Sequence, residues 1–450
     1  MRMSFLTDKQ TLKDLHILGK YRRDSIFSVF NCTQTFGGEH LLESMFQQPL
    51  TRLADINKRS DLVAFFRRQQ QQLIIDLEDL DLAQNFISGD AGGSMLQSSL
   101  YISRNWLWQK LGLPENRTHF QRAIRAVIRL LAQLRAYIQS LGIEQHQPLL
   151  GDTPLANLWI LESKELHALE EELAKHAENL PFALAVRGDY LLRYRWSNAL
   201  RDAFSMIYFI DTFQSIAQVA NARGFIRAEA RPAEQQTLLF SNLYHPTVPN
   251  AVGNDIAYSK DSNLIFLTGA NMAGKSTYMK SLGIAIYLAH MGFPVPAAQM
   301  QFSIKEGLFT SINVEDDISL GHSHYYAEVL RVKTVAEAVA QGKQLLVIFD
   351  ELFKGTNVKD AFEATFAVSA AFQKHTSCQY LISTHIVEVG EQLKTVAPQV
   401  QFLKMPTIMR GQIPTYTYRA EPGISADKHG MVLIHKENVL ELLEKSRSKF

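Results

Sequence analysis

The feature that most constrains this chain is a glycine-rich loop, Gly269–Thr277, with the sequence GANMAGKST. It follows an apolar run at 264–268 and opens a helical stretch at 278–290. A glycine-rich loop of this pattern between a strand and a helix is typical of a phosphate-binding loop. The glycines let backbone N–H groups face phosphate oxygens, and the start of the helix adds partial positive charge. The alternative is a glycine turn with a chance Lys-Ser.

The loop predicts a nucleoside triphosphate site that uses ATP and Mg²⁺. Lys275 would reach the β- and γ-phosphates, and the Ser276 hydroxyl would ligate the metal. The nucleotide-contacting residues predicted from the loop are Gly269, Ala270, Asn271, Met272, Ala273, Gly274, Lys275, Ser276 and Thr277.

Two later apolar runs, 345–349 and 380–383, end in residues that suit ATP hydrolysis. After the first, Asp350 is predicted to complete the magnesium site with Ser276, and Glu351 to hold and deprotonate the attacking water. After the second, His385 could sense the γ-phosphate, so Glu351, Lys275 and His385 are the candidate catalytic residues. The alternatives are a solvated strand end for the acids and a helix cap with an incidental histidine.

The two halves of the chain differ in pattern, which predicts a fold of the α plus α/β class. Residues 1–240 have apolar positions at helical spacing, with helices expected at 117–141, 162–178 and 197–222 and a loop at 85–99. Residues 241–450 alternate short apolar runs with helices, which indicates a largely parallel sheet covered on both faces. The strands expected there are 264–268, 308–312, 345–349 and 380–383.

Composition excludes several classes of protein. The 450 residues include 46 Lys and Arg against 45 Asp and Glu, so only a local patch could hold a polyanion. Two cysteines are too few for a disulfide scaffold or a structural zinc site. The first residues lack the apolar core of a signal peptide, and no run approaches the roughly 20 apolar residues that span a bilayer. We therefore expect a cytoplasmic protein with no membrane partner.

These residues resemble the MutS family of DNA mismatch-repair ATPases, within the wider ABC-type ATPase class. The loop TGANMAGKSTYMK is similar to the family's T-G-P-N-M-x-G-K-S-T-Y-x-R, with Ala270 for Pro. The other similar motifs in the second half are Tyr244–Pro246, Gly292–Ala297, Glu315–Ile318, Ser323–Glu328 and Asp350–Asn357. In the first half they are Thr11–Leu15, Asn31–Gly38, Gln48–Leu50 and Asp211–Ala222.

The resemblance implies a MutS-like helical core and lever domain over 1–240 and a P-loop ATPase domain over 241–450. It further implies a homodimer through the ATPase domains, in which Ser323 of one subunit faces the nucleotide of the other. His245 would lie near the adenine. DNA, double-stranded or branched, and repair proteins would be the partners.

This sequence also departs from the family pattern. It begins at the core region, so we expect neither the N-terminal mismatch-reading domain nor a C-terminal nuclease-like domain. The helical half is short for full levers plus a DNA clamp. His324, Lys354 and Asn357 differ from the family residues near the site that two subunits would share. We expect these differences to affect the rate of ATP hydrolysis and the geometry of the dimer more than nucleotide binding.

A basic stretch at 101–150 gives a moderate argument for DNA binding. Arg122, Arg125 and Arg129 share one helix face, with Trp106 and Trp108 shortly before them. The alternative is a solvated face that pairs with the acidic helix at 162–178.

Three hypotheses remain open. The first is a MutS-type, ATP-dependent DNA-binding protein whose nucleotide cycle moves levers on DNA, in or near mismatch repair. The second is a mechanical ATPase of the same class that acts on a protein partner or branched DNA, and the third is a nucleotide-binding scaffold with negligible turnover. DNA-stimulated hydrolysis favours the first, hydrolysis indifferent to DNA favours the second, and ATP binding without hydrolysis favours the third.

Overall fold

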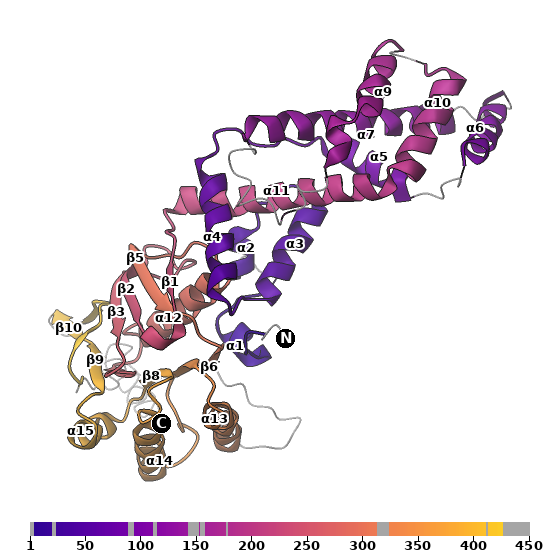
Figure 1. The fold of residues 1–450 in the computed structure, drawn as a ribbon. Coiled ribbons are helices and arrows are strands. Elements are labelled where there is room, and N and C mark those ends of the chain that lie inside the picture. The colour runs from indigo at the N-terminus through magenta and orange to yellow at the C-terminus, as the bar shows by residue number, and fades with distance from the viewer. Residues whose placement is uncertain are drawn as a thin grey trace, which may run out of the picture. The chain divides into compact units, whose positions relative to one another are not determined.

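The structure is a computed structural model that describes residues 4–19, 24–88, 94–110, 115–142, 153, 158–176, 179–312, 324–410 and 413–425. The chain divides into two compact units (Figure 1). The first, here the sheet unit, comprises Met1–Phe30, Met45–Ser60 and Val219–Phe450. The second, the helical unit, comprises Asn31–Ser44 and Asp61–Gln218. Fold class is mixed helix and sheet, as expected, while the domain boundary at residue 240 stays a prediction.

Within the residues that the structure describes, helices account for the regular structure of the helical unit. The described helices wholly within it are α5 (Leu77–Ser88), α6 (Met95–Lys110), α7 (Glu115–Ser140), η3 (Trp159–Glu162), α9 (Lys164–Ala174), α10 (Phe182–Asp189) and η4 (Tyr190–Arg195). Three more contribute residues to both units: α3 (Phe36–Gln47), α4 (Leu53–Arg68) and α11 (Ser197–Arg223).

Two of the three predicted helices are confirmed, as α7 and α11. The prediction for 162–178 was wrong at both ends, because a short 3-10 helix precedes α9, which starts after an N-cap at Ser163 and ends at Ala174. The loop expected at 85–99 was too long, since α5 continues to Ser88 and α6 begins at Met95. The prediction relied on the glycines of this segment, but the helices on either side extend closer to them than we expected.

The apolar stripe of α7 is the core of its packing against neighbouring helices. All six predicted members are buried: Phe120, Ile124, Val127, Ile128, Leu131 and Leu134. Burial of such side chains is worth roughly 1.5–3 kcal/mol each, which explains why an amphipathic sequence of this length is helical.

Asp211 on α11 is a buried polar anchor within the helical unit. Its carboxylate accepts hydrogen bonds from the backbone N–H groups of Gln34 and Thr35 at 3.0 and 2.8 Å, and from the Thr35 hydroxyl at 2.6 Å. A Cβ on Gly38 would lie 2.4 Å from an Asp211 oxygen, so glycine is required at this close approach. The anchor fixes the segment that precedes α3.

The main sheet of the sheet unit has the order β12-β9-β4-β8-β7-β6. All its pairings are parallel except that of β12. Its strands are β4 (Leu264–Gly269), β6 (Gly307–Ser311), β7 (Leu345–Phe349), β8 (Gln379–Ser383), β9 (Gln401–Met405) and β12 (Glu421–Pro422). The four predicted strands and their parallel arrangement are confirmed, with ends that differ by one residue at most.

Helices cover both faces of this sheet (Figure 1). Val347 and Phe349 belong to the core beneath α13 (His324–Ala340), α14 (Val358–Phe372) and α15 (Val387–Val396). Ile348 points the other way, where its side chain would be 3.4 Å from a Cβ on Gly283 of α12 (Lys275–His290). This alternation explains why the strands are apolar throughout.

A smaller sheet with the order β1-β5-β2-β3 belongs to the same unit. Its strands are β1 (Glu229–Arg231), β2 (Leu238–Leu243), β3 (Asn254–Tyr258) and β5 (Gln299–Ser303). The other elements described in this unit are α1 (Lys9–Asp14), α2 (Ile26–Phe30), the short helix η5 (Ala233–Gln235) and the hairpin of β10 (Thr407–Arg410) with β11 (Ile413–Tyr416).

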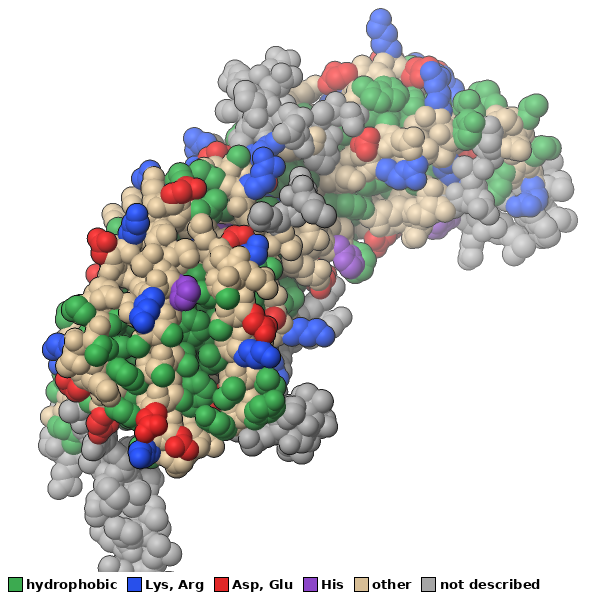
Figure 2. All heavy atoms as spheres, turned by 60° about the horizontal axis from the view of Figure 1, so that its bottom comes forward, with side chains coloured by type: hydrophobic (Ala, Val, Ile, Leu, Met, Phe, Trp, Pro, Cys, Tyr) green, Lys and Arg blue, Asp and Glu red, His purple; other side chains and the backbone are tan. Residues whose placement is uncertain are grey.

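The outward surface of α13, α14 and α15 keeps apolar side chains exposed. Figure 2 shows hydrophobic side chains gathered on this face of the sheet unit. Tyr326 and Leu330 of α13, Val358 of α14 and Val396 of α15 are among the exposed large hydrophobic residues. Packing within the unit therefore leaves this layer partly uncovered. Among the described helices, none is long and apolar enough to cross a bilayer.

We predict that Asp211→Ala lowers the free energy of unfolding by about 3 kcal/mol, because it leaves the two buried donors of Thr35 and the part-buried N–H of Gln34 without an acceptor. Urea unfolding followed by circular dichroism measures this change. Gln218→Ala on the same helix is the control, since Gln218 is exposed and its loss should cost under about 0.5 kcal/mol. Equal stability of the two variants would contradict an anchoring role for Asp211.

Candidate nucleotide-binding site

The glycine-rich loop connects β4 to α12, and its glycines are needed where they stand. Gly269 has a φ of 151° and Gly274, the N-cap of α12, has a φ of 101°. A Cβ on Gly269 would lie 3.0 Å from the Met405 carbonyl oxygen, and one on Gly274 would lie 3.0 Å from the Tyr418 ring. The backbone can therefore make this turn only with glycine at these positions. It leads into the N-terminus of a 16-residue helix, where free N–H groups favour an anion.

Lys275 folds back over the loop that precedes it. Its Nζ donates to the carbonyl oxygens of Gly269 and Ala270 at 2.9 and 3.2 Å. Burial lowers the pKa of this ammonium, and the nearby charges of Asp350 and Glu351 act in the opposite direction. Among the described residues no carboxylate forms an ion pair with it, so the charge is held by carbonyl dipoles and remains available to an anion.

Asp350, directly after β7, meets the start of α12. The Ser276 hydroxyl donates to its Oδ2 at 2.6 Å, and the Ser383 hydroxyl donates to its Oδ1. Its backbone N–H donates to the Ser311 carbonyl at 2.9 Å. The structure thus brings the two predicted metal ligands together. Ser383 was missed by the sequence reasoning, although its place at the carboxyl end of a predicted strand was a usable signal.

Glu351 pairs with His385, the histidine after β8. The Nε2 of His385 lies 2.5 Å from Glu351 Oε1. This hydrogen bond, together with the charges of His385, Lys354 and Lys275, lowers the pKa of Glu351 against the opposing effect of burial. Because an ionised carboxylate can only accept, Nε2 is the donor. Glu351 is therefore an ionised carboxylate beside Lys275, as a proton acceptor must be.

The backbone at Glu351 is held in an uncommon conformation. Glu351 and Phe353 have φ values of 53° and 62°, in the left-handed region that disfavours side chains. The residues Leu352 and Phe353 are buried in the core beneath α13 to α15, which fixes the turn. Such conformations persist only where surrounding packing determines them, and they cluster at functional sites.

The remaining predicted residues are less closely joined to this cluster. The Nδ1 of His245 accepts from the backbone and hydroxyl of Thr247 at 3.4 and 3.2 Å, and its ring lies within electrostatic range of Lys280 on α12. Among the described residues, His245 forms no hydrogen bond or ion pair with the loop. Ser323 and the acidic residues at 315–317 lie outside the described residues, as does the side chain of His324.

Two departures from the family pattern have a structural explanation. Asn357 caps α14, where its side chain accepts from the Asp360 N–H at 3.0 Å, a role that asparagine and serine perform about equally well. Lys354 is exposed, and its positive charge acts on Glu351 in the way an arginine would.

Tyr418 is a second residue that sequence reasoning missed. Its half-exposed ring lies against Gly274, and its backbone is fixed by Asn254, which donates to the Tyr418 carbonyl at 2.9 Å and accepts from Ala420 at 2.7 Å. An aromatic face beside a phosphate loop can stack on a planar base. No sequence motif marks this position.

These residues fit Mg-ATP on chemical grounds. Serine hydroxyl and carboxylate oxygens are ligands that Mg²⁺ accepts while it keeps waters and phosphate oxygens. The hydrogen bond between the Ser276 hydroxyl and Asp350 shows that one such ion could contact both. The arrangement can therefore bind a triphosphate and place a base beside it.

The basic face of α7 is engaged within the helical unit. Arg122 pairs with Glu78 at 2.7 Å and Arg129 with Asp79, both on α5, while Arg125 donates to the His176 carbonyl. Arg135 pairs with Glu170 of α9 at 2.7 Å. These contacts favour the structural alternative for the stripe, with α5 as the main partner rather than the acidic helix. The side chains of Trp106 and Trp108 lie outside the described residues.

Comparison with known proteins shows that two segments of this chain match known protein families. MutS domain III matches residues 10–221, and MutS domain V matches residues 265–448. A DNA mismatch repair protein MutS from Petrotoga mobilis is 27% identical over 293 residues, which are 63% of this chain and 35% of that protein. Another from Clostridioides difficile is 31% identical over 246 residues, 52% of this chain and 25% of that protein. The chain thus spans about a third or less of these relatives.

We predict that His245 stays neutral in the folded protein until the pH falls to about 4. Burial and the positive charges of Lys280 and His16 lower its pKa to about 4, against about 6.5 for a free imidazole. Its contribution to stability is therefore complete above pH 6.5 and is lost as the pH falls toward 4. An NMR titration of histidine-labelled protein, assigned with His245→Gln, measures this pKa. A resonance that titrates near 6.5 would contradict the buried environment.

Proposed function

Since this chain contains MutS domains III and V and is homologous to MutS mismatch repair proteins, we propose that it is an ATP-dependent DNA-binding protein of the MutS type. It would act in or near mismatch repair. ATP would bind and be hydrolysed at Lys275, Ser276, Asp350 and Glu351. The hydrogen bond of 2.6 Å between Ser276 and Asp350 carries the proposal, because it joins the phosphate loop to the acidic strand end.

Each residue of the cluster has a role in this proposal. The backbone N–H groups at the start of α12 and the Lys275 ammonium hold the phosphates, while Ser276 and Asp350 hold the metal. Magnesium supplies neutralisation of the charge that develops on the phosphate oxygens. Glu351 accepts the proton of the attacking water, and His385 keeps its carboxylate oriented through the bond to Oε1. Tyr418 stacks on the base.

The dimer and the movement complete the proposal. Two copies would face each other through their nucleotide sites, with Ser323 of one copy contributing to the site of the other, as the resemblance implies. ATP binding would hold the copies together and hydrolysis would release them. The helical unit would act as the lever, since α3, α4 and α11 each contribute residues to both units.

A second candidate is a mechanical ATPase of this type that acts on a protein partner or branched DNA. The observation that favours its protein-partner form is the pairing of Arg122, Arg125 and Arg129 with acidic and carbonyl groups of the helical unit. The acids of α5 compete with phosphate oxygens for these guanidinium groups, on duplex and branched DNA alike.

The ATPase rate, measured against duplex, mismatched, branched and single-stranded DNA, decides between the two candidates. Stimulation by duplex or mismatched DNA supports the first. Stimulation by branched DNA alone, or a rate indifferent to every DNA form, supports the second. The absence of any hydrolysis overturns both and leaves a nucleotide-binding scaffold.

We predict that Lys275→Ala weakens ATP binding by about 100-fold, since charged hydrogen bonds to phosphate are worth about 1.5–3 kcal/mol each. A fluorescent ATP analogue measures the affinity. Lys260→Ala, which removes an exposed lysine of the same unit, should bind ATP as the unsubstituted protein does. Similar affinities of both variants would remove Lys275 from the site.

We predict that Glu351→Gln binds ATP normally but hydrolyses it about 10²- to 10⁴-fold more slowly, because the proton acceptor is lost while the phosphate contacts remain. Single-turnover phosphate release measures the step, and size-exclusion chromatography with ATP should show accumulated dimers. Glu388→Gln on the nearby helix α15 is the control, because Glu388 is exposed. A Glu351→Gln variant that cycles at the control's rate would exclude Glu351 as the base.

A further inference from the structure

The N-terminal segment lies along the edge strand of the main sheet. Residue Leu6 forms a parallel bridge with Gly307 of β6, where Leu6 N–H donates to the Glu306 carbonyl at 2.8 Å and Leu308 N–H donates to the Leu6 carbonyl at 2.9 Å. The chain then forms α1, whose N-cap is Asp8. This places α1 beside the carboxyl end of β6, far from it in sequence.

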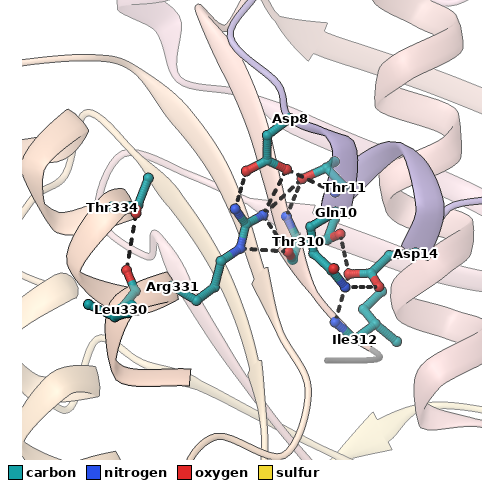
Figure 3. A network of polar contacts seen from close by, with 9 residues as sticks. All are labelled: Asp8, Gln10, Thr11, Asp14, Thr310, Ile312, Leu330, Arg331 and Thr334. Carbon is teal, nitrogen blue, oxygen red and sulfur yellow. Dashed lines mark hydrogen bonds and ion pairs between the residues drawn. The ribbon is translucent and has the colours of Figure 1, made fainter. Parts of the chain in front are cut away.

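Asp14, the last residue of α1, is buried and its carboxylate binds the end of β6 (Figure 3). Its Oδ2 accepts from the Thr310 hydroxyl at 2.7 Å and from the Ile312 N–H at 2.9 Å. Its Oδ1 accepts from the Gln10 side chain at 2.8 Å. One carboxylate oxygen therefore holds the residues on both sides of Ser311.

A second set of contacts holds the same strand end. The Thr310 N–H donates to the Thr11 hydroxyl at 3.0 Å, and Arg331 of α13 donates to the Thr310 carbonyl at 2.7 Å (Figure 3). Arg331 also forms an ion pair with Asp8. Burial raises the Asp8 pKa, but the hydrogen bonds from Arg331 and Thr11 outweigh it and leave the pKa below its usual value. The Asp8–Arg331 pair is therefore charged at neutral pH.

Ser311 connects this network to the candidate site. Its carbonyl accepts the Asp350 N–H at 2.9 Å, one residue beyond the last pair of the β6–β7 register. The Asp350 carboxylate in turn accepts from Ser276 and Ser383. The end of an edge strand has a neighbouring strand on one side only, so its position depends on other contacts. Here α1 supplies them.

We propose that Asp14 is a positioning residue for the nucleotide site, which holds Thr310 and Ile312 so that Ser311 fixes the backbone of Asp350. The inference rests on the proposed function of Asp350 as a magnesium ligand. It extends the site beyond the residues of the phosphate loop and the acidic strand end, to a helix near the start of the chain. Asp14 touches neither nucleotide nor metal in this role.

The test compares Asp14→Ala with Asp14→Asn and with Lys13→Ala, an exposed residue of the same helix. Binding of a fluorescent ATP analogue is measured without metal and across a Mg²⁺ titration, well below the melting temperature of each variant. We expect Asp14→Ala to raise the Mg²⁺ concentration for half-saturation by roughly fivefold, as loss of one or two hydrogen bonds would, with metal-free binding unchanged. Asp14→Asn should have a Mg²⁺ dependence close to that of the unsubstituted protein, because the amide oxygen of asparagine can accept both hydrogen bonds from β6.

Hydrogen exchange gives a readout that does not depend on the nucleotide. In Asp14→Ala, the amides of Ile312 and Asp350 should exchange faster, while those of β4 should not change. If Asp14→Ala does not fold, Thr310→Val removes one of the two bonds and should shift both readouts in the same direction by a smaller factor.

The possible outcomes separate the positioning role of Asp14 from the proposed function. A Mg²⁺ dependence equal to that of Lys13→Ala overturns the positioning role and leaves the proposed function intact. A shift in metal-free binding as large as that with Mg²⁺ means a general structural role and also overturns it. An unsubstituted protein that binds no nucleotide overturns the proposed function, and the inference with it.

Discussion

The hydrogen bond between the Ser276 hydroxyl and the Asp350 carboxylate joins two parts of the chain that the sequence separates widely. It exists because β4 and β7 lie on either side of β8 in a parallel sheet, so their carboxyl ends meet at one edge. Backbone hydrogen bonds hold these strands in one register, in which Leu267 pairs with Ser383 and Ser311 with Phe349. The polar cluster at its edge depends on this register, since a shift by one residue would turn Asp350 to the opposite face.

The arginines of α7 and the lysine of the candidate site lie in different surroundings. Within the helical unit, Arg122, Arg129 and Arg135 pair with acids on neighbouring helices. In the sheet unit, Lys275 is buried with carbonyl partners, and Glu351 is bound to His385. Paired charges on a helix surface contribute little to stability, and they reduce what the surface offers to a polyanion. A buried cation with only carbonyl partners is instead suited to a ligand that brings negative charge.

Local patterns predicted the strands, which the structure confirms. They also placed the glycine-rich loop and Asp350 at the same end of the sheet, where Ser276 and Asp350 are hydrogen-bonded, while the roles of these residues stay predictions. Each of these signals is local, because a strand and the polar residues that follow it are adjacent in the sequence, and the carboxyl ends of parallel strands meet at one edge of the sheet. The same reasoning gave wrong limits for the loop at 85–99 and for the helix at 162–178. Glycine content and charge do not show at which residue a helix that packs against its neighbours begins or ends. The reasoning also missed Ser383 and Tyr418, whose importance comes from what they touch.

The sequence alone predicts a nucleotide site, from glycines at 269 and 274, a lysine and a strand-terminal acid pair. The contacts of Asp14 with the end of β6, and those of the α7 arginines with acids of α5, became visible only in the folded chain. The physical reason is the range of the interactions. A phosphate loop is set by torsion angles of adjacent residues, whereas a buried carboxylate or an ion pair between helices exists only after distant segments have packed.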